Sequence, residues 1–135
     1  MKFENGKFLF VKKRTKYPKT YEECCKVLLL NPERASFSVG GFEYKRHDIV
    51  NLQKLLICRD AYWKIAGEEM GFGKPLEPDW SNAAQRKYCI VNTEGNVLKW
   101  VQKTTNKILA FPTEEMRDAF KENFKDLIEE CKELL

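Results

Sequence analysis

The sequence predicts a small α+β domain in which helices pack on a three-stranded antiparallel meander. Apolar residues recur at helical spacing in three segments, and three short β-favouring runs follow one another too closely for parallel crossovers. The 135 residues contain no internal repeat and no Pro/Gly/Ser linker, so we expect one domain, 1–135. The expected order is α-α-β-β-β-α, behind a possible N-terminal hairpin.

The first helix is expected from about Thr20 to Leu30. Thr20 and Glu23 have the spacing of a capping box, and Asn31-Pro32 follows as a stop signal. The next segment, 33–46, has little periodicity, so we expect it to be irregular.

The second helix is expected from Asp48 to about Met70. Its apolar residues recur at intervals of three and four, and Gly71 follows in the position that usually ends a helix in the left-handed conformation. At about 1.5 Å per residue, such a helix crosses the whole domain and acts as its spine.

The sheet and its cover are expected in the second half of the chain. The strand candidates are 87–91, 97–101 and 108–111, and a polar Thr93-Glu94-Gly95-Asn96 turn separates the first two. Pro112-Thr113 then starts a helix that covers the sheet. Its apolar stripe consists of Met116, Ala119, Phe120, Phe124, Leu127, Ile128 and Cys131.

Charge is distributed unevenly along the chain. Residues 1–19 hold seven Lys or Arg and one acid, whereas residues 114–135 hold eight acids and four Lys or Arg. Asn5-Gly6 in the basic segment favours a hairpin, and its lysines alternate with aromatic residues, as in a strand that follows phosphates and stacks on bases. This segment is either such a nucleic-acid contact or a solvated arm. The candidate nucleic-acid contacts are Lys12, Lys13, Arg14 and Lys16.

The compartment is expected to be the cytoplasm. The amino terminus has no apolar core of signal-peptide length, and no segment approaches the roughly 18 apolar residues of a membrane span. The five cysteines are odd in number and lie mostly in apolar stripes, which favours reduced, packed thiols over a disulfide framework. We therefore expect no membrane contact.

No catalytic, metal or cofactor pattern is recognisable. His47 is the single histidine, so a thiol-dependent enzyme would need a Cys–His pair made by long-range folding. Cys24-Cys25 lacks the spacer of a zinc site, and Gly71-Phe72-Gly73-Lys74 follows a helix, whereas a phosphate loop follows a strand. We expect no metal, no cofactor and no enzymatic activity, with a thiol enzyme as a minor alternative.

The loop before the first strand is the candidate interaction site. Asp79 can cap its turn and Trp80 can pack over the end of the long helix, which is a structural interpretation of this loop. In the functional interpretation, the same loop and the start of the strand present a recognition surface. The candidate residues are Asp79, Trp80, Asn82, Lys87 and Tyr88.

Three stretches of the chain resemble an uncharacterised family of small proteins from gut bacterial genomes and their phages or other mobile elements. They are Leu76 to Tyr88 with its Pro-Asp-Trp-x-Asn motif, the opening helix from Thr20 to Leu28, and the closing strand and helix from Ile108 to Leu127. Leu76 and Gln85 depart from the pattern, which has a tryptophan and an acid there. The resemblance implies a compact α+β fold and a mobile-element origin, and it implies no particular reaction.

These observations favour a non-enzymatic interaction protein of phage or mobile-element type that acts through protein contacts. Binding of single-stranded or duplex nucleic acid by the basic N-terminal segment is the alternative. The sequence does not choose an oligomeric state.

Overall fold

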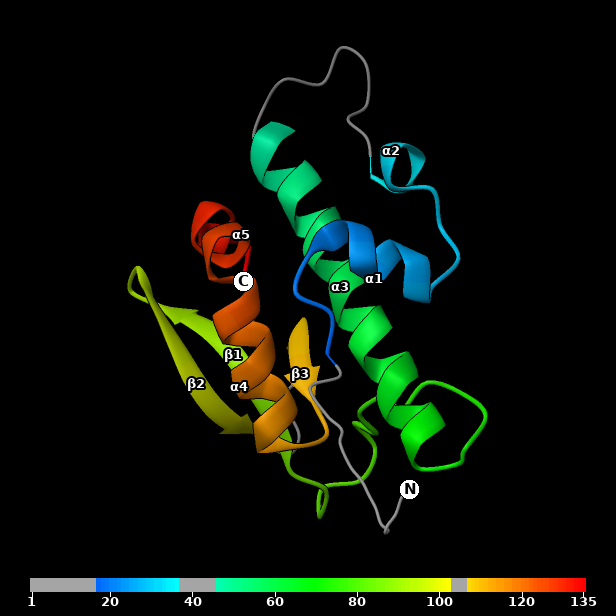
Figure 1. Ribbon diagram of the computed structural model, residues 1–135. Coiled ribbons are helices and arrows are strands. Elements are labelled where there is room, and N and C mark those ends of the chain that lie inside the picture. Colours follow the sequence, from blue (N-terminus) through cyan, green and yellow to red (C-terminus); the bar gives the residue numbers. More distant parts are fainter. Residues whose placement is uncertain (1–16, 37–45, 103–106) are drawn as a thin grey trace, which may run out of the picture.

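The computed structural model describes residues 17–36, 46–102 and 107–135, and these form an α+β fold (Figure 1). The predicted N-terminal hairpin lies outside the described residues. The helices are α1 (Tyr21–Val27), α2 (Pro32–Ala35), α3 (Arg46–Glu69), α4 (Glu114–Asn123), α5 (Lys125–Glu130) and the short 3-10 helix η1 (Lys132–Leu134). The strands are β1 (Lys87–Thr93), β2 (Asn96–Gln102) and β3 (Leu109–Phe111).

Helix α1 starts as predicted but ends earlier. The Thr20 side chain accepts a hydrogen bond from the Glu23 amide, as in a capping box. At the other end, the Leu30 amide donates to the Cys25 carbonyl and the Leu29 amide to the Lys26 carbonyl, which is a Schellman cap. The cap closes the helix before Leu29, and the predicted stop signal Asn31-Pro32 instead begins the one-turn helix α2.

Helix α3 confirms the predicted spine, since it runs the length of the molecule and α1, α5 and β3 pack against it (Figure 1). Gly71 has φ +76 and ends the helix in the left-handed conformation, as predicted. The chain then folds back on α3 so closely that a Cβ at Gly67 would lie 1.8 Å from the Lys74 carbonyl oxygen. Gly67 therefore permits the return of the loop that leads to the sheet.

The closing helix is interrupted at Phe124, where one continuous helix was expected. Phe124 has φ −120 and ψ 27, so α4 ends there and α5 begins with a changed direction. The buried Phe124 ring lies 4.9 Å from that of Phe120 and 6.0 Å from that of Tyr62. The break keeps the apolar side of α5, including Ile128, on the core.

The sheet is antiparallel, and its order is β2-β1-β3. β3 therefore pairs with β1, and not with β2 as in a simple sequential meander. The centre is taken by β1, whose Cys89, Ile90 and Val91 are all buried, because a central strand is covered on both faces. Both β2 and β3 are edge strands.

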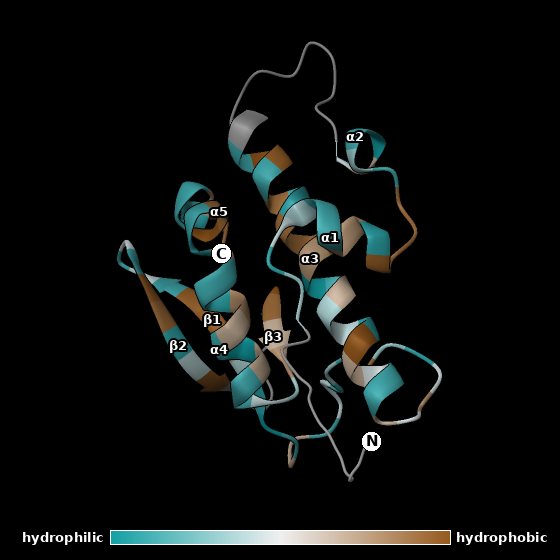
Figure 2. Cartoon of the chain, viewed as in Figure 1, coloured by the Kyte–Doolittle hydropathy of each residue, from teal (hydrophilic) through white to brown (hydrophobic). Residues whose placement is uncertain are grey.

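The two faces of the sheet are covered differently. Ile90, Leu109 and Phe111 belong to the main core with α1, α3, α4 and α5. The opposite face carries a smaller cluster of Cys89, Val91 and Ala110, with Trp80 packed against it. Figure 2 shows apolar residues on all three strands, including the edge strand β2.

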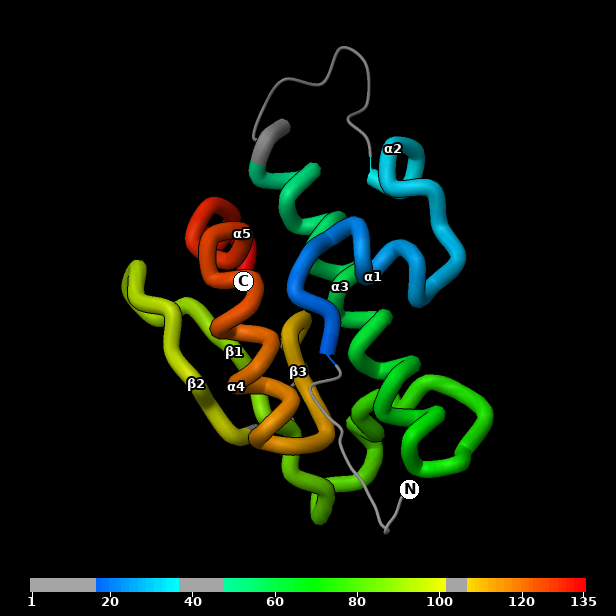
Figure 3. The backbone as a smooth tube through the Cα atoms, viewed as in Figure 1, coloured from blue at the N-terminus to red at the C-terminus, as the bar shows by residue number. Residues whose placement is uncertain are grey.

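The described chain begins on the β3 side of the sheet. Tyr17 stacks on Tyr62 with ring centroids 4.9 Å apart, and the Tyr62 ring in turn contacts Phe111 of β3. Figure 3 shows the first described residues between α3 and β3, with β2 on the far side of the sheet. None of the helices in the described segments has the length and apolar character that a bilayer-spanning helix needs.

Candidate functional site

Asp79 of the predicted interaction loop caps a turn. Its carboxylate accepts hydrogen bonds from the Ser81 amide at 3.1 Å and the Ser81 hydroxyl at 2.5 Å, and these bonds lower the pKa of Asp79. The Asp79 amide donates to the Gln85 side-chain oxygen, which closes the loop from its other end. The carboxylate is thus already engaged by its own loop.

Trp80, Asn82 and Lys87 come together around a buried lysine, with Trp80 partly exposed and Asn82 exposed. Lys87 is fully buried; its ammonium donates to the Asn82 carbonyl at 2.6 Å and lies 5.4 Å from the centroid of the Trp80 ring. Tyr88 is separate from this group, because Arg117 of α4 lies over its ring at 5.5 Å. The geometry favours the structural interpretation of the loop.

The cysteines do not have the surroundings of catalytic thiols. All five are buried and free. Burial raises the pKa of Cys89 and of Cys131 to about 11, and the pKa of Cys25 and Cys58 is also raised. An activated thiol needs the opposite shift.

His47 lies in the first turn of α3, and within the three described segments no group of three His, Cys, Asp or Glu residues could hold a metal ion.

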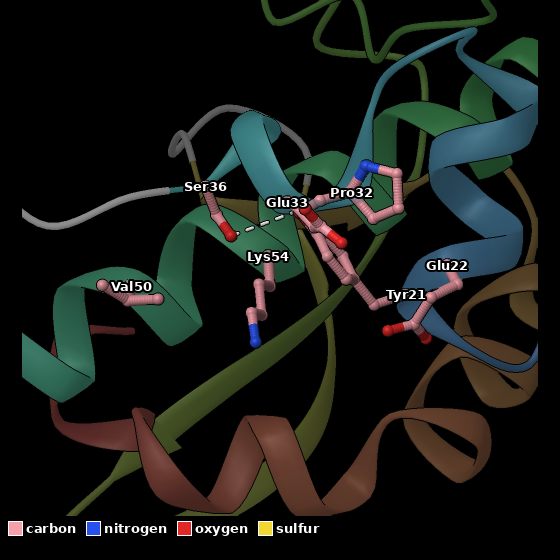
Figure 4. Close-up of a pocket in the computed structure, with 7 residues that line it drawn as sticks. All are labelled: Tyr21, Glu22, Pro32, Glu33, Ser36, Val50 and Lys54. Carbon is pink, nitrogen blue, oxygen red and sulfur yellow. Dashed lines mark hydrogen bonds between the residues drawn. The ribbon is translucent and has the colours of Figure 1, made fainter.

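A hollow of about 400 Å³ lies between α1, α2 and α3 (Figure 4). The Tyr21 hydroxyl reaches the Pro32 carbonyl at 2.9 Å and the Ser36 hydroxyl at 3.1 Å, and the Lys54 ammonium lies 5.3 Å from the centroid of the Tyr21 ring. Glu22 and Glu33 also line this hollow, so groups of both charges face it. This mixed lining selects no particular ligand charge.

The outer edge of β2 carries backbone groups that face away from the sheet. Glu94 has φ 52 and Gly95 has φ 86, so the β1–β2 hairpin closes with a type I′ turn. In such a hairpin the residues flanking the turn form a hydrogen-bonded pair, and pairing alternates along the strands. The backbone groups of Leu98 and Trp100 thus face β1, whereas those of Val97, Lys99 and Val101 face away from it.

Over the described residues, these outward backbone groups have no hydrogen-bond partner. No hydrogen bond from the described residues reaches the outward N–H and C=O groups of Val97, Lys99 or Val101. Apolar side chains flank them: Leu98 is 40%, Trp100 50% and Val101 46% exposed. The Lys99 ammonium lies 3.5 Å from the Asp118 carboxylate of α4. An open strand edge with apolar side chains is a template for another strand.

The other edge of the sheet is closed. The same alternation turns the backbone groups of Ala110 outward from β3, and the buried Trp63 indole of α3 donates to the Ala110 carbonyl at 3.0 Å. Two residues earlier in the chain, Arg59 of α3 donates to the Ile108 carbonyl at 2.9 Å. Side chains from α3 therefore take up backbone groups that a further strand would need.

The edge of β2 does not stand out in the sequence, and the candidate contacts predicted from it lie elsewhere in the chain. Lys12, Lys13, Arg14 and Lys16 lie outside the described residues. The local sign of an edge is Lys99, the charged residue within the apolar run Val97 to Val101, since a charged residue in the middle of a strand is typical of an edge strand.

Comparisons of the chain with protein-family models, with curated proteins and with solved structures gave no match.

Proposed function

We propose that this protein is a non-enzymatic interaction protein that acts through protein contacts, and that its contact surface is the open edge of β2. The observation that carries the proposal is the row of outward backbone groups at Val97, Lys99 and Val101, flanked by the exposed Leu98 and Trp100. A partner segment in extended conformation would form backbone hydrogen bonds with the outward groups and pack its side chains on Leu98 and Trp100.

The energetics of an edge support this surface. Each outward N–H and C=O that exchanges water for a partner gains about 0.5–1.5 kcal/mol net. Burial of the exposed half of an indole adds apolar contact, and tryptophan is enriched among the residues that dominate protein interfaces. A phage or mobile-element origin, which the resemblance of the sequence implies, fits a small protein that acts on a partner.

The experiment is photo-crosslinking at the edge. The crosslinker p-benzoylphenylalanine replaces Trp100, which keeps an aromatic group there, and the chain is produced in the cells that naturally make it. The control carries the same crosslinker at Glu122 of α4, whose side chain is 76% exposed. Adducts are separated by mass, before and after nuclease treatment.

A protein adduct formed at position 100 and absent at position 122 is the expected result. The proposal is wrong if position 100 forms no protein adduct, or if both positions form the same ones. An adduct that nuclease removes would instead support nucleic-acid binding, the alternative that the basic N-terminal segment predicts.

A further inference from the structure

We propose that the strand accepted by this edge is β2 of a second copy of the chain, so that two sheets join across a two-fold axis. This inference rests on the proposed function, because it names the occupant of the same edge. Its basis is the symmetry of the strand about Lys99.

Apolar residues are placed symmetrically along β2. In the order of the strand, Val97 and Leu98 precede Lys99, and Trp100 and Val101 follow it. An antiparallel pair centred on Lys99 therefore places Leu98 opposite Trp100 of the second copy, and Val97 opposite Val101 of the second copy. Each apolar residue meets an apolar residue, on both faces of the joined sheet.

The backbone geometry of the edge agrees with this register. The residues that face outward are Val97, Lys99 and Val101, and this register pairs them only with one another. Their outward N–H and C=O groups can then exchange hydrogen bonds across the axis. Leu98 and Trp100 of the second copy occupy a non-hydrogen-bonded pair, where side chains approach most closely.

The two neighbouring registers lose these matches. A shift by two residues in one direction puts Lys99 opposite Val97 and Trp100 opposite Asn96. A shift in the other direction puts Lys99 opposite Val101 and Leu98 opposite Gln102. Both shifts place apolar residues against polar ones, so the register centred on Lys99 is favoured.

Charge at the axis is compensated. The register brings the two Lys99 side chains directly opposite each other, which alone would destabilise the pair. Asp118 lies 3.5 Å from Lys99 within each copy, and Arg117, which also contacts the Asp118 carboxylate, is paired with Glu114 at 3.3 Å. The charges of these four side chains sum to zero, so each Lys99 is compensated within its own copy and the repulsion at the axis is reduced.

The described chain enters the fold away from β2. The described chain starts on the β3 side, where Tyr17 stacks on Tyr62, and β2 lies beyond β1 on the far side of the sheet (Figure 3). A second copy brings a strand that already has the required conformation.

The experiment is sedimentation velocity of the full chain from low to high micromolar concentration, with two edge variants. Lys99→Glu places carboxylates opposite each other at the axis, beside the Asp118 carboxylates. Lys74→Glu makes the same charge change in the loop that follows α3, where the side chain is exposed, and is the matched control. Lys99→Pro removes an outward N–H that β1 does not use, and urea unfolding reports whether it still folds.

The expected result is a monomer–dimer equilibrium in the natural chain and in Lys74→Glu. Lys99→Glu should raise the dissociation constant at least roughly tenfold, because the ammonium groups that compensate the Asp118 carboxylates at the axis would be replaced by further carboxylates. Lys99→Pro, if folded, should be monomeric throughout.

A chain that is monomeric at every concentration overturns the inference, and so does a dimer that Lys99→Glu leaves unchanged. The crosslinking experiment separates this failure from failure of the proposed function. An adduct of twice the chain mass at position 100 supports a second copy, whereas an adduct of another mass keeps the proposed function and removes the dimer.

Discussion

The two edges of the sheet differ in how their backbone is satisfied. At β3, Trp63 and Arg59 of α3 donate hydrogen bonds to the Ala110 and Ile108 carbonyls. At β2, the outward groups of Val97, Lys99 and Val101 have no such partner among the described residues. Side chains of α3 thus close one edge of the sheet, and over the described residues the other edge has no such cover.

The largest expected effect contrasts Trp63, which closes the β3 edge from α3, with Trp100, which lies in the edge strand β2. Trp63→Ala removes a buried indole and leaves the Ala110 carbonyl without its donor, so it should lower the free energy of unfolding by about 3–5 kcal/mol. Trp100→Ala, at the open edge, should cost at most about 1 kcal/mol in the monomer. Urea unfolding followed by circular dichroism measures both. Equal losses would contradict the distinction between the edges.

The next effect concerns Arg117 of α4, whose side chain contacts the backbone of β2. Arg117 is buried; it donates to the Asp118 carboxylate at 3.0 Å and to the Trp100 carbonyl at 3.3 Å. Arg117→Lys keeps the charge and loses the planar fork, so the free energy of unfolding should fall by about 1–3 kcal/mol. Thermal unfolding of dilute protein reports this. An unchanged midpoint would mean that α4 does not hold β2 through this side chain.

Alkaline pH should weaken the core. The pKa of Cys89 and of Cys131 is raised to about 11 by burial, and the pKa of Cys58 is raised as well. These thiols ionise more readily in the unfolded chain, so their contribution is complete below about pH 8.5 and is lost as the pH rises toward about 11. The urea midpoint should therefore be lower at about pH 10.5 than at about pH 7.5. A midpoint that rises over this interval would contradict the assignment.

The smallest expected effect tests whether another exposed apolar residue contributes to association. Leu29 is 87% exposed and has φ 60, a left-handed conformation that glycine adopts without strain. Leu29→Gly should raise the free energy of unfolding by about 0.5–1 kcal/mol, and it should leave the sedimentation of the chain unchanged. Loss of association in this variant would move the contact from β2 to the end of α1.

The sequence predicted the elements better than their arrangement. The capping box of Thr20, the spine of α3 and its end at Gly71 follow from local chemistry, and the structure has all of them. The strand order does not follow from local chemistry, because the choice of β1 as the centre depends on burial of both its faces. The break at Phe124 is also a tertiary effect, since its ring packs against Tyr62 from another helix.

The candidate site was predicted less well, for a physical reason. Lys87 and Trp80 are residue types that recognition surfaces favour, yet here the lysine is buried and lies over the partly exposed Trp80 ring. The open edge depends on which strand ends up outermost, and the residues of β2 alone do not determine that. Within β2, only Lys99 in the middle of the apolar run Val97 to Val101 indicates locally that this strand lies at an edge.

The most direct test of the open edge is residue-resolved amide exchange along β2 at low and high protein concentration. The amides of Leu98 and Trp100 face β1 and should be protected at both concentrations. Those of Lys99 and Val101 should exchange freely in dilute protein and become protected as the concentration rises. Protection of Lys99 and Val101 that is equal at both concentrations would contradict an edge that is open in the monomer and filled by a second copy.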